Sequence, residues 1–121
     1  MHKLIIILSF SLICFQVWAQ CPVDSVEIEV FILPDDYPGE TSWDLWDNNG
    51  NLLAEGDEIG TSLCVDLNSC LIFTIYDSYG DGICCEYGSG SYSLTDASGN
   101  TLASGGSFGT SEVKNFSVGS E

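Results

Sequence analysis

The sequence contains one segment twice, and this repeat is the strongest constraint on the fold. Residues 42–62 and 91–111 align without gaps at an offset of 49 residues, and eleven of the twenty-one aligned positions are identical. A match of this extent is the signature of an internal duplication. The chain is therefore expected to contain two copies of one structural unit, within halves that span about 24–63 and 70–118.

Each copy has the pattern of a β-hairpin. Trp43 and Leu45 alternate with polar neighbours, as do their counterparts in the second copy, and this period of two is typical of a half-buried strand. A turn that contains glycine follows in both copies, and glycine readily takes the positive φ of tight hairpins. A longer strand is expected before each hairpin, at 26–33 and at 71–76.

The pattern as a whole favours an all-β fold. No segment shows a helical period, and thirteen glycines divide the chain into short stretches. Several short strands with regular turns are typical of a sandwich or a barrel. We expect a small, disulfide-stapled β-sandwich, or a barrel-like variant of it, built from two repeated strand–loop–hairpin units. The simplest arrangement places the two halves face to face across one core.

The first nineteen residues have the layout of a secretory signal peptide. His2 and Lys3 precede a run of apolar residues, and the segment closes with Val17-Trp18-Ala19, a sequence close to the usual cleavage site. Cleavage would leave residues 20–121 as a single domain, without a membrane-inserted segment. The protein is therefore expected to be secreted, to the medium, the cell surface or the periplasm.

The charge balance excludes several kinds of function. All eighteen acidic residues follow the signal segment, where Lys114 is the single basic residue. Nucleic acids are excluded as partners, because their phosphates are bound by Lys and Arg. The chain has no Arg, and His2 is its single histidine. It therefore lacks the pairs that activate a Ser or Cys nucleophile, and an enzyme is not expected. The acidic residues could also serve only to keep the protein in solution.

Five cysteines remain after cleavage, and in an exported chain they indicate a disulfide framework. Adjacent cysteines rarely bridge each other, so Cys84 and Cys85 are expected to reach separate partners, with Cys64 and Cys70 as the nearest candidates. Cys21, next to the new terminus, is then the unpaired one. It could remain free or form an interchain disulfide.

Two acidic loops, at residues 34–40 and 77–86, are the candidate functional segments. Each lies between a long strand and a hairpin, so the repeat places them at equivalent positions. Aspartates next to glycines can direct carboxylate and carbonyl oxygens at one ion, and calcium takes six to eight oxygen ligands. We expect a Ca²⁺ site, although solvated acids on a glycine-rich turn would give the same pattern. The candidate ligands are Asp35, Asp36, Asp77, Asp81 and Glu86, with Glu40 as a further candidate.

Aromatic side chains near the same loops offer an alternative ligand class. Tyr37, Trp46, Tyr79 and Tyr87 could stack on sugar rings. Trp46 is out of phase with the core residue Leu45 and is expected to be exposed. These residues predict carbohydrate binding as the alternative function.

Three motifs resemble a recurring extracellular module. They are Tyr-Pro-Gly-Glu-Thr-Ser-Trp at 37–43, the segment Phe-Thr-Ile-Tyr-Asp-Ser-Tyr-Gly-Asp-Gly-Ile-Cys-Cys at 73–85, and Gly-Gly-Ser-Phe-Gly-Thr-Ser-Glu at 105–112. The module occurs in large bacterial secreted and surface proteins, often beside peptidase, adhesin or type IX sorting domains. The resemblance covers about residues 26–116. It implies a secreted accessory β-sandwich domain with no established reaction.

The sequence thus predicts a secreted, non-catalytic recognition or adhesion module, stabilised by Ca²⁺ through its acidic loops. Its expected partner is an extracellular protein or a glycan. A carbohydrate-binding module is the main alternative, and a small secreted inhibitor or effector and a structural surface protein are two others.

Overall fold

The computed structural model describes residues 21–57 and 60–119. The predicted signal peptide, residues 1–19, lies outside this part of the chain. No helix among the described residues is long and apolar enough to cross a membrane. The elements are β1 (Ser25–Leu33), η1 (Pro38–Glu40), β2 (Thr41–Asp47), β3 (Leu52–Gly56), β4 (Thr61–Asp66), β5 (Cys70–Asp77), β6 (Cys84–Cys85), β7 (Gly88–Ser89), β8 (Ser91–Asp96), β9 (Thr101–Gly105) and β10 (Ser111–Ser117).

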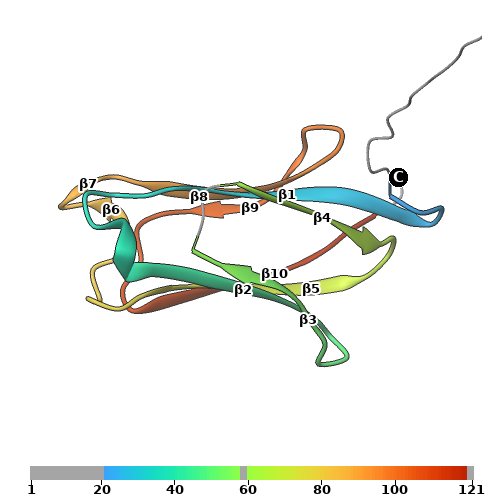
Figure 1. Ribbon diagram of the computed structural model, residues 1–121, viewed down its shortest axis with the longest axis horizontal. Coiled ribbons are helices and arrows are strands. Elements are labelled where there is room, and N and C mark those ends of the chain that lie inside the picture. Colours follow the sequence, from blue (N-terminus) through green and yellow to red (C-terminus); the bar gives the residue numbers. More distant parts are fainter. Residues whose placement is uncertain (1–20, 58–59, 120–121) are drawn as a thin grey trace, which may run out of the picture.

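The strands form two four-stranded antiparallel sheets that stack as a sandwich (Figure 1). One sheet has the order β4-β1-β8-β9, and the other has the order β10-β5-β2-β3. A two-stranded ribbon of β6 and β7 lies at one end of the molecule. This architecture confirms the prediction of a small all-β, disulfide-stapled fold.

The two halves of the sequence are interlaced, and the expectation that they face each other as separate layers was wrong. Strand β1 of the first half pairs with β8 of the second, while β5 of the second half pairs with β2 of the first. The reason is that each long strand and the hairpin after it lie in different sheets. The repeat is still visible in the registers, because Tyr92 pairs with Ile32 and its counterpart Trp43 pairs with Ile75.

The two hairpins share their turn chemistry. In the first turn, Asp47 Oδ1 accepts hydrogen bonds from the amides of Asn49 and Asn51, both at 2.9 Å. In the second, Asp96 Oδ1 accepts the equivalent bonds from the amides two and four residues later, at 2.9 and 3.0 Å. In both turns an asparagine side chain also donates to Oδ2. These bonds, led by the one from the asparagine side chain, hold the pKa of both carboxyls below its ordinary value.

The core lies between the sheets and is centred on three aromatic rings. Phe73 packs against Trp43 and Tyr92, with ring centroids 5.9 and 5.3 Å apart. Alternate residues of the central strands point inward, as the period of two predicts. The other buried apolar residues are Ile28, Val30, Ile32, Leu45, Val65, Leu71, Ile75, Ile83, Leu94 and Val118.

The disulfides differ from the expected ones. Cys21 is bonded to Cys64, and Cys84 is bonded to Cys85, while Cys70 is exposed and has no disulfide partner in the described part of the chain. Cys21 is therefore not the spare cysteine, and the expectation that it either stays free or forms an interchain bond was wrong. The turn before β1 brings Cys21 beside β4, where its α-carbon is 5.5 Å from that of Cys64. Cys70 begins β5 and Cys84 follows its end, so a strand roughly 24 Å long separates them.

Candidate functional site

The two predicted loops lie at the same end of the sandwich (Figure 1). The first loop includes η1, and the second includes β6 of the β6–β7 ribbon. They meet because Thr41, which begins β2, pairs with Asp77, which ends β5. Backbone bonds then join the loops directly. The Ser78 amide donates to the Glu40 carbonyl at 2.9 Å, and the Asp36 amide donates to the Tyr87 carbonyl at 2.8 Å. Residues far apart in the sequence therefore share one surface.

Asp77 is the buried anchor of the second loop, with 1% of its surface exposed. Its Oδ2 accepts hydrogen bonds from the amides of Asp81, at 2.7 Å, and Gly82, at 3.0 Å. The chain can fold around this carboxylate because Gly82 takes a φ of +71°, and a Cβ there would collide with the Phe108 carbonyl. The loop backbone thus fixes the position of Asp81.

Three carboxylates meet at this point. Glu40, Asp77 and Asp81 each offer an oxygen atom that lies within 4.8 Å of those of the other two. Glu40 is the last residue of η1, Asp77 is the last residue of β5, and Asp81 lies in the loop that follows. Asp81 Oδ1 is shielded from solvent, and no group among the described residues donates a hydrogen bond to it. An oxygen in this position is costly to leave unpaired, so the arrangement favours a bound proton or cation.

The charges of this group act on one another. The pKa of Asp81 is raised, first by the adjacent Asp77 carboxyl, which would accept a hydrogen bond from the protonated form, and further by desolvation and by the Asp77 charge. The pKa of Glu40 is raised by desolvation first and then by the charges of Asp77, Asp81 and Asp35. Repulsion between neighbouring carboxylates contributes to both shifts, because negative charges held close together disfavour ionisation.

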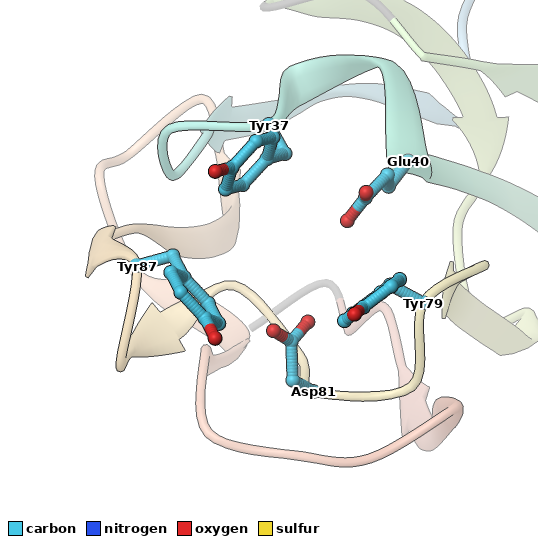
Figure 2. A pocket seen from close by; sticks show the side chains of 5 residues that line it. All are labelled: Tyr37, Glu40, Tyr79, Asp81 and Tyr87. Carbon is cyan, nitrogen blue, oxygen red and sulfur yellow. The ribbon is translucent and has the colours of Figure 1, made fainter.

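A pocket of about 200 Å³ opens beside the carboxylates, lined by Tyr37, Glu40, Tyr79, Asp81 and Tyr87 (Figure 2). Figure 2 shows the Glu40 and Asp81 carboxylates pointing into the space between the three tyrosines. The Tyr37 and Tyr87 rings meet edge to face, with centroids 5.7 Å apart and planes at 79°. The tyrosines are 51%, 71% and 41% exposed, in chain order. The pocket therefore combines aromatic faces with anionic oxygens.

The predicted metal ligands divide into two groups. Asp77 and Asp81 belong to the three-carboxylate group, which Glu40 completes. Asp35 lies close enough for its charge to act on the group, and its Oδ1 accepts a bond from the Tyr37 amide at 2.9 Å. The other two candidates, Asp36 and Glu86, have exposed side chains outside the group.

The predicted aromatic residues also divide. Three of them line the pocket, whereas Trp46 does not. Trp46 pairs with Ile72 near the start of β5, while the pocket lies beyond the end of that strand. Its side chain is half-buried rather than exposed.

Sequence reasoning missed the contribution of the segment at 105–112, whose backbone is hydrogen-bonded to the second acidic loop. The Thr110 carbonyl accepts a hydrogen bond from the Asp77 amide at 2.8 Å, and the Gly106 carbonyl accepts one from the Ile83 amide at 3.1 Å. The signal was present, since residues 105–112 form one of the three distinctive motifs. The motif itself does not indicate that this segment forms hydrogen bonds with the acidic loop at 77–86.

Comparison of the chain with protein-family models, with curated proteins and with solved structures gives no match.

Proposed function

We propose that this protein is an exported, non-catalytic recognition module whose binding end is stabilised by a calcium ion. One observation carries the proposal. Carboxylate oxygens of Glu40, Asp77 and Asp81 converge from two loops, and Asp81 Oδ1 is buried there without a partner. A divalent cation would neutralise the repulsion within this group and supply the missing interaction.

The donor set suits calcium better than a transition metal. All three candidate ligands are carboxylates, and oxygen donors suit hard cations such as Ca²⁺. Zinc sites are usually completed by histidine or by cysteine thiolate. The nearest cysteines, Cys84 and Cys85, are bonded to each other, and no histidine follows residue 2.

The recognition role follows from where the ion would sit. It would join the loop at 34–40 to the loop at 77–86, next to the tyrosine-lined pocket. Loops held on a rigid β-scaffold are frequent binding surfaces. The two disulfides fit an oxidising compartment, which supports export through the predicted signal peptide. The lack of Arg, and of His beyond residue 2, supports a role without catalysis.

Calcium titration of the purified protein tests the proposal. We expect saturable heat in calorimetry and a rise in the unfolding temperature that EGTA reverses. At a free concentration of 100 times the dissociation constant, the ion should stabilise the native state by about 2.7 kcal/mol. Asp81→Asn and Glu40→Gln should each weaken calcium binding at least tenfold. Asp77 is left unchanged, because its carboxylate also holds the loop backbone.

Asp66→Asn is the matched control. It removes the same unit of charge from an exposed aspartate on β4, outside the three-carboxylate group. Its calcium affinity should equal that of the parent protein. If Asp66→Asn weakens calcium binding as much as Asp81→Asn does, the loss of affinity comes from the overall negative charge and not from a specific site. Absence of any calcium-dependent heat or stabilisation would refute the proposal.

A further inference from the structure

We propose that the tyrosine-lined pocket binds a neutral saccharide, and that a pair of adjacent sugar hydroxyls completes the coordination of the calcium ion. This inference rests on the calcium site proposed above and names the ligand of that same site. Its structural basis is the pocket formed by Tyr37, Tyr79 and Tyr87 around the Glu40 and Asp81 carboxylates.

The protein side chains cannot fill the coordination shell alone. Asp77 Oδ2 already accepts two backbone hydrogen bonds, so Asp77 can direct one oxygen at the ion. Glu40 and Asp81 can add two each, which gives at most five side-chain oxygens. Calcium takes six to eight ligands. The backbone carbonyls of Glu40 and Asp77 already accept hydrogen bonds from Ser78 and Gly80. The side chains therefore leave between one and three positions for other oxygens, such as those of a backbone carbonyl, water or a ligand.

These open positions face the pocket. The Glu40 and Asp81 carboxylates point into it (Figure 2), whereas Asp77 is buried and does not line it. A ligand seated in the pocket would thus reach the ion directly. Two adjacent hydroxyls of one sugar ring can replace two water molecules, and they bring no charge with them.

The tyrosine rim suits the ring of the same ligand. Tyr79 is 71% exposed, a large value for an aromatic side chain beside a pocket. Exposed aromatic faces offer apolar contact to the C–H groups of a sugar, and the phenol groups offer hydrogen bonds. The pocket volume of about 200 Å³ lies below the roughly 300–1,000 Å³ typical of small-molecule sites. The pocket should therefore hold a single sugar unit, with the rest of a glycan outside it.

The charge of the protein selects a neutral ligand. The formal net charge is −16, and Asp35 and Glu86 add negative charge close to the pocket. An anionic ligand would be repelled by this field. An ammonium group would compete with calcium for the same carboxylates. A neutral polyol avoids both conflicts.

Calorimetric titration with neutral methyl glycosides tests the inference. The probes are the methyl glycosides of mannose, galactose and glucose, each with calcium and with excess EGTA, and a neutral glycan array extends the search. We expect at least one of these ligands to bind in calcium and to lose binding in EGTA. Tyr79→Ala and Tyr87→Ala should weaken sugar binding at least tenfold and change calcium affinity less than twofold.

Tyr76→Ala is the matched control, because Tyr76 is an exposed tyrosine next to Asp77 that does not line the pocket. It should bind sugar as the parent does. Calcium binding without any neutral glycan ligand would overturn this inference and leave the proposed function standing. Sugar binding that persists in EGTA would overturn the calcium-bridged mode. Failure of calcium itself to bind would remove both proposals.

Discussion

The hydroxyl of Tyr92 donates a hydrogen bond of 2.5 Å to Oε1 of Glu112, and this bond joins the two sheets of the sandwich. Tyr92 lies on β8 with 1% of its surface exposed, and Glu112 lies on β10. The repeat counterpart Trp43 differs, because its indole Nε1 is buried without a partner. The two halves therefore share a backbone plan but use different polar contacts in the core.

Tyr92→Phe should lower the free energy of unfolding by about 1.5–3 kcal/mol, the usual net contribution of a hydrogen bond to a charged group. The ring remains, so its packing against Phe73 should be kept. Urea unfolding at neutral pH measures the change. A variant as stable as the parent would show that the bond between the sheets contributes nothing.

The same variant should change the alkaline limit of stability. Desolvation by burial raises the pKa of Tyr92 first, and the hydrogen bond and charge of Glu112 raise it further. The folded state therefore holds this proton more tightly than the unfolded state does. The resulting stability is complete below the ordinary pKa of 10.0 and is lost as the pH rises towards the folded value. Unfolding curves above pH 10 should fall less steeply for Tyr92→Phe than for the parent.

Asp47→Ala and Asp96→Ala should each lower the unfolding temperature by a few degrees, and by similar amounts. The reason is that the two carboxylates accept the same set of hydrogen bonds in the two turns. Thermal unfolding by circular dichroism measures both. Asp66→Ala, at an exposed position on β4, is the control and should leave the temperature nearly unchanged. Clearly unequal losses at Asp47 and Asp96 would contradict the equivalence of the turns.

Acid should weaken the same two turns. Hydrogen bonds lower the pKa of both aspartates below the ordinary 3.8, so their contribution is complete above that value and is lost as the pH falls through the folded pKa. The double Asp47→Ala, Asp96→Ala variant should therefore lose less stability than the parent between neutral pH and pH 3. If the parent and the double variant lose the same stability between neutral pH and pH 3, groups other than Asp47 and Asp96 cause the loss in acid.

Alkylation without prior reduction should modify Cys70, and peptide mapping should recover Cys21 linked to Cys64. Cys70→Ser should leave stability unchanged within about 0.5 kcal/mol, as for most surface substitutions. Cys21→Ser should cost about 4 kcal/mol, from a loop-closure estimate for a sequence separation of 43 residues. Recovery of alkylated Cys21 in the parent protein would contradict this pairing.

The strands and turns could be predicted because their signals are local. Alternation around Trp43 and Leu45 reports which side of a strand is buried, and a glycine after Asp47 reports a turn. The partner of each strand is a non-local property, and the duplication alone is compatible with separate or interlaced halves. The crossing of the loop at 34–40 from one sheet to the other decides between them.

The site was predicted only in part, because some of its residues give a local signal and others depend on strand pairing. The spacing of Asp77 and Asp81 on a glycine-rich loop is a local signal, and both residues belong to the carboxylate group. Glu40 joins them only because β2 and β5 are neighbours in one sheet. The cysteine prediction failed on the same point, since it weighed distances along the chain rather than the sheet ends where the cysteines lie.

The interlaced strands also bear on how such a chain could have arisen. A chain of half this length would carry a long strand and a hairpin that belong to different sheets, and it could complete neither sheet alone. Two copies could complete both by exchanging these elements, as in a domain-swapped homodimer. The present protein has the strand arrangement that such an assembly would have, with both halves in one chain. Its two separately produced halves should therefore regain structure only when they are mixed.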